Sequence, residues 1–174
     1  MDVACGQGRH ARWFYDRNHT LVLVDLAQAA IESIAIPASA CEAVVADIEN
    51  SPWPFTGRQF DAVVVTNYLW RPLWPTLLDS LAPAGVLIYE TFTQGNETVG
   101  KPSRVDFLLR PGELLTLCNG LRIVGFEEGF QDEPDRQQPR FIQRIVAVRE
   151  TAHETGAPEP HGQPLPTSPR YHLP

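Results

Sequence analysis

The stretch that decides the fold is residues 1–10, Met-Asp-Val-Ala-Cys-Gly-Gln-Gly-Arg-His. It predicts the end of a strand, a glycine turn and the start of a helix. Gly6 and Gly8 carry no side chain, so backbone N–H groups can approach a ligand closely, and the helix presents its positive end to the same place. The pattern predicts a nucleotide-type cofactor at this turn. Because the turn begins at Asp2, we expect Met1 to be an internal or mis-assigned start, or the chain to be a truncated relative.

The composition predicts one globular domain. The chain has 174 residues, of which 43% are hydrophobic and 20% are charged, enough to form a core. Its formal net charge of −7 and the absence of a basic run argue against a nucleic-acid partner. A small-molecule substrate is expected instead, and the sequence does not indicate an oligomeric state.

The cysteines and the apolar runs indicate a cytoplasmic protein. Cys5, Cys41 and Cys118 are widely spaced and odd in number, as expected of reduced, buried thiols rather than disulfides or a metal site. The sequence has no signal peptide and no apolar run of the roughly 20 residues that a membrane helix needs. We therefore expect neither a metal nor a membrane association.

A change in composition near Glu150 divides the chain. Residues 151–174 contain six prolines, at 158, 160, 164, 166, 169 and 174, and no apolar periodicity. Such a segment buries too little surface to offset its ordering entropy. The prediction is a folded domain over 1–150 and a disordered Pro-rich tail over 151–174.

Strands and helices alternate before this boundary. Wholly apolar runs end at acidic or polar residues and are separated by helical segments, a pattern typical of an α/β domain with a mostly parallel sheet and helices on both faces. Strands are expected over 21–24, 42–46, 60–66, 86–90, 121–126 and 141–148, and helices over 27–34, 71–81 and 111–118. Residues 91–110 are expected to form a long loop, either a functional lid or a solvated connection.

The last two strands differ from the others. The segment between them, about 127–140, contains Gly129, Pro134 and Pro139 and shows no helical stripe. A parallel crossover needs about a dozen residues or more, usually with a helix. These strands are therefore predicted to form an antiparallel β-hairpin at one edge of the sheet.

Acidic residues follow successive strands. Asp25 ends the strand after the glycine turn, and Asp47 ends the next one. In parallel sheets the binding crevice lies beyond the carboxyl ends of the strands, where these carboxylates could accept hydrogen bonds from a ribose and an adenine amino group. Each aspartate taken alone is more often a helix cap or a solvated turn residue. Ile48 offers an apolar face, and Asn67 and Tyr68 follow the next strand.

This ordered set resembles the class I S-adenosylmethionine-dependent methyltransferases over residues 2–149, and more distantly the small bacterial tellurite-resistance type. The resemblance is carried by residues 2–8, Asp25, residues 46–48, residues 60–65 and the terminal hairpin. It implies a Rossmann-like fold, S-adenosyl-L-methionine as cofactor, and methyl transfer to an unidentified small molecule. The implied cofactor-binding residues are Asp2, Ala4, Gly6 and Gly8 toward the methionine part, Asp25 at the ribose, Asp47 and Ile48 at the adenine, and Asn67 near the methyl group.

The acceptor side and two alternatives stay open. The catalytic candidates are Asn67, Tyr68 and Arg104, the last with Lys101 in the long loop. The chain could instead be a degenerate, non-catalytic module of the same fold. An NAD-dependent oxidoreductase is a further alternative, because Gly6-x-Gly8-x-x-Ala11 also satisfies a dinucleotide fingerprint. The terminal hairpin and the lack of a second domain argue against it.

Overall fold

A single mixed sheet organises the protein. The computed structural model describes residues 1–132 and 138–151. The sheet has seven strands in the order β3-β2-β1-β4-β5-β7-β6. The strands are β1 (Asp2–Val3), β2 (Leu21–Asp25), β3 (Cys41–Val45), β4 (Phe60–Thr66), β5 (Leu81–Phe92), β6 (Arg122–Gln131) and β7 (Arg140–Val148). Strands β1 to β5 pair in parallel, whereas β7 is antiparallel to both β5 and β6.

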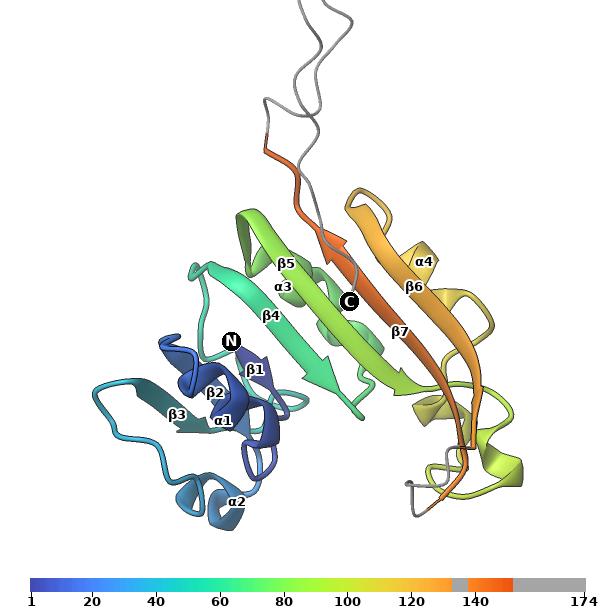
Figure 1. The fold of residues 1–174 in the computed structure, drawn as a ribbon, viewed down its shortest axis with the longest axis horizontal. Helices are drawn as coiled ribbons and strands as arrows, with labels where there is room; N and C mark the ends of the chain where they lie inside the picture. Colours follow the sequence, from blue (N-terminus) through green and yellow to red (C-terminus); the bar gives the residue numbers. More distant parts are fainter. Residues whose placement is uncertain (133–137, 152–174) are drawn as a thin grey trace, which may run out of the picture.

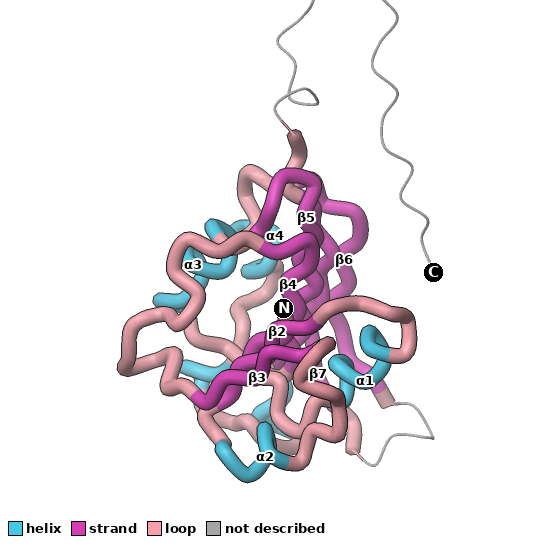
Figure 2. Tube along the Cα trace, turned by 90° about the vertical axis from the view of Figure 1, so that its left-hand side faces the viewer, coloured by secondary structure: helices cyan, strands magenta, loops and turns pink. Residues whose placement is uncertain are grey.

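Short helices lie on the two faces of this sheet. The α-helices are α1 (Arg9–Tyr15), α2 (Gln28–Glu32), α3 (Trp74–Asp79) and α4 (Glu113–Leu117), and three 3-10 turns are η1 (Arg71–Leu73), η2 (Asn96–Thr98) and η3 (Val105–Phe107). In Figure 1, α1 lies in front of the sheet, while α3 and α4 lie behind it. Figure 2 shows α3 and α4 on one side of the strands and α1 on the other. The predicted fold class is confirmed.

The main core lies between the sheet and the α3–α4 layer. Strand positions on that face, such as Val63, Leu87 and Ala147, are fully buried. Trp74 of α3 stacks on Tyr89 of β5, with ring centroids 4.7 Å apart. A smaller cluster joins Ala11 of α1 to the other face of β2. The apolar runs are thus buried on both faces around β1 and β2, as expected for central parallel strands.

The hairpin prediction is confirmed, although its strands are longer than expected. Strand β6 continues to Gln131, because each of its residues from Phe126 onward pairs with β7. Strand β5 starts at Leu81 rather than 86, with a shift of register opposite Phe60. Residues 83–85, for which the sequence predicts a turn, lie in this register shift. Ala84 there has φ of 61° and donates its N–H to the Arg149 carbonyl at 2.8 Å. The predicted helix over 71–81 therefore ends at Asp79.

Residues 91–110 do not form an open loop. Thr91 and Phe92 belong to β5, and η2 and η3 follow. Asn96, which is 1% exposed, donates to the Pro102 carbonyl at 3.0 Å and accepts the Phe141 N–H at 3.1 Å. This side chain anchors the segment to β7. The predicted tail, apart from Thr151, lies outside the described residues, so its disorder stays a prediction.

Candidate cofactor site

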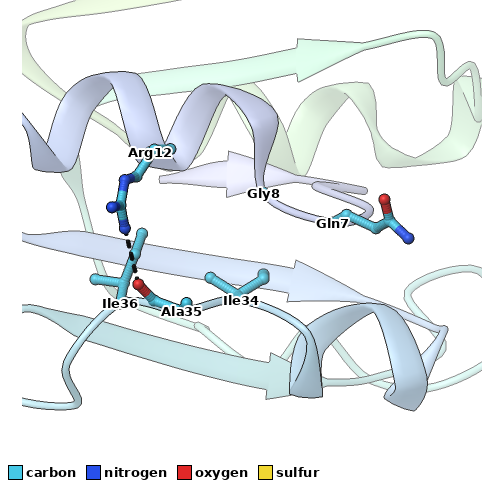
Figure 3. A pocket seen from close by; sticks show the side chains of 6 residues that line it. All are labelled: Gln7, Gly8, Arg12, Ile34, Ala35 and Ile36. Atoms are coloured by element: carbon cyan, nitrogen blue, oxygen red, sulfur yellow. Dashed lines mark hydrogen bonds between the residues drawn. The ribbon is translucent and has the colours of Figure 1, made fainter.

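The glycine turn has the backbone conformation that its sequence predicts. Gly6 and Gly8 have φ of 54° and 74°, in the left-handed region that glycine adopts without strain. An added Cβ on Gly8 would lie 3.1 Å from Ile34, whereas on Gly6 it would meet no atom within 4 Å. Gly8 is therefore needed for packing, and Gly6 faces open space. A cavity of about 280 Å³ lies beside this turn, between Gly8, Arg12 and residues 34–36, and the Gln7 side chain points away from the other residues that line it (Figure 3).

Asp25 is held directly against this turn. Its Oδ2 accepts the Gly6 N–H at 2.8 Å, and its Oδ1 accepts the Ala27 N–H at 2.8 Å. A carboxylate offers about four lone-pair positions, so each oxygen retains capacity for a hydroxyl donor. The carboxylate and the open space before Gly6 thus lie side by side at the carboxyl end of β2.

The Asp47 carboxylate has fewer free hydrogen-bond acceptor positions than that of Asp25. Its Oδ1 accepts the N–H groups of Glu49 and Asn50, both at 3.0 Å, and the Asn50 amide donates to its Oδ2 at 3.0 Å. The Asn50 side chain and then these backbone donors lower the pKa of Asp47. Asp47 therefore caps its own turn, the second of the two roles that the sequence left open. Ile48 is half-buried and packs against the main core.

Tyr68, which follows β4, contacts the segment that follows β3. Its hydroxyl donates to Glu49 Oε1 at 3.2 Å. Burial, followed by the negative charges of Glu49, Asp47 and Asp25, raises its pKa. These acidic groups therefore surround one phenol, which stays protonated and acts as a donor. Glu49 was missed from the sequence, although it lies two residues after Asp47.

Asn67 and Arg104 have different environments. Asn67 follows β4 with φ of 55°, donates its backbone N–H to the Glu90 carbonyl at 2.8 Å, and leaves its side chain exposed. Arg104 pairs with Asp106 at 2.9 Å and lies over the Phe107 ring, 5.1 Å from its centroid. Those contacts stay within its own segment, and among the described residues Arg104 is not joined to Asp25 or Tyr68.

In the first motif, the Asp2 side chain is buried and the Cys5 side chain is half-buried. Asp2 is 4% exposed, and both of its carboxylate oxygens lack a hydrogen-bond partner. Burial, and then the charges of Asp2 and Asp25, raises the pKa of the Cys5 thiol to about 12. Cys5 is thus a neutral thiol, not a thiolate nucleophile. Ala4, between them, has φ of 53° and leads the chain into the turn.

His10 lies at the edge of the same region. Its Nδ1 is 3.4 Å from the Thr66 hydroxyl at the end of β4. Burial and the adjacent Arg9 lower its pKa, against a raising effect of Glu90. Among the residues described, no group of His, Cys, Asp and Glu is arranged to hold a metal ion.

Comparison with known proteins agrees with this geometry. Residues 1–84 match the family model described as a methyltransferase domain. The fold matches that of an S-adenosylmethionine-dependent methyltransferase from Mesorhizobium loti with a TM-score of 0.66 and 17% identity, over 85% of this chain and 89% of that one. The chain therefore has the fold of a class I S-adenosylmethionine-dependent methyltransferase, and its first 84 residues match a methyltransferase-domain model. No curated protein sequence matches it.

Two further solved structures share this fold. TehB from Haemophilus influenzae has a TM-score of 0.69 and 13% identity, over 86% of this chain and 57% of TehB. This chain thus spans little more than half the length of TehB. The plantazolicin methyltransferase BpumL, solved with S-adenosylhomocysteine, has a TM-score of 0.63 and 12% identity, over 86% of this chain and 76% of BpumL. At these identities the likeness concerns the fold.

Proposed function

We propose that this methyltransferase domain binds S-adenosylmethionine at the Gly6–Asp25 crevice and transfers its methyl group to a small-molecule acceptor. The hydrogen bond from Gly6 to Asp25 carries the proposal, because it places a carboxylate beside a turn with no side chain. When bound, S-adenosylmethionine supplies a methyl group already activated on a sulfonium. The chain's residues then need to hold it, align it and exclude water.

The expected roles follow the positions of the residues. Asp25 accepts the ribose hydroxyls, and the turn of Ala4, Gly6 and Gly8 lies against the methionine part. Ile48 offers its half-buried side chain to the adenine ring. Asp47 accepts a hydrogen bond from the adenine amino group only with the lone pairs that its contacts with Glu49 and Asn50 leave free. Asp2 supports this turn from within the sheet, because its side chain is buried.

The acceptor is expected near Asn67 and Tyr68, at the end of β4. The raised pKa of Tyr68 suits a hydrogen-bond donor rather than a general base. A base is needed only if the acceptor arrives protonated. Lys101 and Arg104 are exposed cations that could attract an anionic acceptor. If they do, Lys101→Ala with Arg104→Ala raises the KM for that acceptor severalfold and leaves cofactor affinity unchanged; unchanged turnover removes both residues from the site.

Calorimetry separates this function from the alternatives. We expect micromolar binding of S-adenosylmethionine and S-adenosylhomocysteine that is lost in Asp25→Ala and kept in Asp79→Ala, a control on exposed Asp79 of α3. Binding of NAD alone indicates an oxidoreductase, and no binding of any of the three indicates a non-catalytic module. A screen of thiols, amines, hydroxyls and oxyanions with labelled cofactor then identifies the acceptor.

We also expect the protein to act in the cytoplasm. All three cysteines are free thiols, and Cys41 and Cys118 are buried, consistent with a reducing compartment. Among the described residues, the helices are too short or too polar to cross a membrane. Fractionation of the native host tests the location.

A further inference from the structure

One hydrogen bond joins two loops that follow strands on either side of β1 and β2. The Tyr68 hydroxyl donates to Glu49 Oε1 at 3.2 Å. Tyr68 lies two residues after β4, and Glu49 lies four residues after β3. In the sheet order β3-β2-β1-β4, strands β2 and β1 separate the two. Neighbouring strands lie about 4.8 Å apart, so the loops converge from starting points about 14 Å apart. The contact therefore spans the carboxyl ends of β1 and β2.

The same phenol lies close to the carboxylates of the proposed adenosine site. Burial, and then the negative charges of Glu49, Asp47 and Asp25, raises the pKa of Tyr68. Nearby negative charges disfavour a phenolate, and in water they act mainly over short distances. The Tyr68 hydroxyl therefore stays protonated, as a donor to Glu49 must, and it lies beside the two aspartates expected to hold the ribose and the adenine.

The two partners of this hydrogen bond differ in how firmly they are held. The Tyr68 carbonyl accepts the Tyr89 hydroxyl at 2.7 Å, and Tyr89 is itself 1% exposed and stacked on Trp74. Glu49, in contrast, has an exposed side chain. The bond can therefore break by rotation of the Glu49 side chain into solvent, while Tyr68 keeps its place on the core.

We propose that the hydrogen bond between Tyr68 and Glu49 is a latch that must open for the adenosine part of the cofactor to enter or leave. This inference rests on the proposed function, which places the adenosine between Asp25 and Asp47. A latch across the entry path slows association and dissociation alike. A side chain that only contacts the bound cofactor acts on dissociation instead, as most changes at a binding surface do.

Rapid-mixing kinetics with S-adenosylhomocysteine test the latch. Tyr68→Phe keeps the ring and removes the donor, and Glu49→Ala removes the acceptor. We expect each variant to raise both kon and koff roughly three- to tenfold, the effect of one lost hydrogen bond, and to leave Kd within about twofold of the wild-type value. The double variant should be no faster than either single variant, because all three lack the same bond.

Two further variants serve as controls. Glu49→Gln keeps a carbonyl oxygen that can accept from Tyr68, so it should restore slow kon and koff relative to Glu49→Ala. Tyr15→Phe removes a hydroxyl at the far end of α1 (Arg9–Tyr15) and should leave both rates at the wild-type value.

Three results would overturn the latch and leave the cofactor site standing. They are wild-type rates in both Tyr68→Phe and Glu49→Ala, a rise in koff without a rise in kon, and additive effects of the two changes in the double variant. If the unaltered protein binds no S-adenosylhomocysteine, the proposed cofactor site is wrong and the latch is rejected with it.

Discussion

The carboxylate of Asp25 and the backbone N–H of Gly6 are joined by a 2.8 Å hydrogen bond across 19 positions of sequence. This contact fixes the glycine turn relative to the end of β2. Asp25 also accepts the Ala27 N–H, at 2.8 Å, and so links the turn to the start of α2. The candidate ribose site thus depends on one side chain that also positions two backbone segments.

Asp25→Asn should therefore affect both binding and stability. One carboxylate oxygen becomes an NH2 group, which cannot accept from Gly6 or Ala27. Because hydrogen bonds to charged groups contribute about 1.5–3 kcal/mol, we expect S-adenosylhomocysteine affinity to fall roughly 10- to 100-fold and unfolding free energy by about 1–2 kcal/mol. Calorimetry and urea unfolding measure the two effects, and wild-type affinity in Asp25→Asn would remove Asp25 from the site.

Gly6→Ala and Gly8→Ala should have opposite profiles. Both positions have positive φ, so each alanine costs about 1–2 kcal/mol of stability. Gly8→Ala adds a contact at 3.1 Å to Ile34 and should be the less stable variant, with partial recovery in a Gly8→Ala, Ile34→Ala double variant. Gly6→Ala places a methyl group in the open space before the turn, and should lose more cofactor affinity than Gly8→Ala. Urea unfolding and calorimetry compare the two variants. A larger loss of cofactor affinity in Gly8→Ala than in Gly6→Ala would contradict the placement of the cofactor at the Gly6 side of the turn.

Arg71 should hold residues 105–113 in place. Its guanidinium forms two hydrogen bonds to Glu113, at 2.7 and 2.8 Å, and donates to the carbonyls of Asp106 and Leu108. Lysine cannot reproduce this fork, so Arg71→Lys should cost about 2 kcal/mol and speed amide exchange at Leu108. The exposed pair of Arg104 with Asp106 is the control, since Arg104→Lys should cost less than about 0.5 kcal/mol.

The stability contributed by the ion pair of Arg71 with Glu113 depends on pH in a defined direction. The Arg71 side chain, the largest lowering influence, depresses the pKa of Glu113 below its ordinary 4.5. A depressed carboxyl pKa stabilises the fold above the unfolded value, and this stabilisation is lost as the pH falls through the folded value. The stability difference between wild type and Arg71→Lys should therefore shrink below about pH 4. A difference that grows on acidification would exclude the ion pair as its cause.

Because of Asp2, the free energy of unfolding should change with pH in the opposite direction near neutrality. Burial raises its pKa from 3.8 to about 7, so between about pH 4 and 7 the folded state retains a proton that the unfolded state releases. Stability then falls as the pH rises through this window, by up to about 4 kcal/mol, and levels off above it. Asp2→Asn should remove that slope in urea unfolding at about pH 5, 6, 7 and 8. An unchanged slope in Asp2→Asn would assign it to other groups.

Local patterns predicted the order of the elements. The runs before Asp25 and Thr66 are wholly apolar, and the segment after Gln131 has no helical stripe, so both the parallel strands and the terminal hairpin followed from short-range sequence. The early start of β5 did not, because residues 83–85 have turn chemistry and lie within a shift of the β4–β5 register, where Ala84 and Gly85 are hydrogen-bonded to Arg149.

The site was predictable to a similar depth. The contact of Asp25 with the turn is expected from its place at a strand end. The cap formed by Asp47 depends on Asn50, three residues later. The hydrogen bond from Tyr68 to Glu49 depends on how two separate loops are placed. Neither contact can be deduced from the order of the residues. The anchoring of Asn96 to Phe141 spans 45 positions and has no local signal.

The position of β7 has a consequence for biosynthesis. This strand is the last of the described strands along the chain, yet it lies between β5 and β6. Within the described residues β6 pairs with β7 alone. During translation β6 therefore stays without a paired strand until residues 140–148 leave the ribosome. A nascent chain halted before Arg140 would therefore lack two strands of the sheet rather than one.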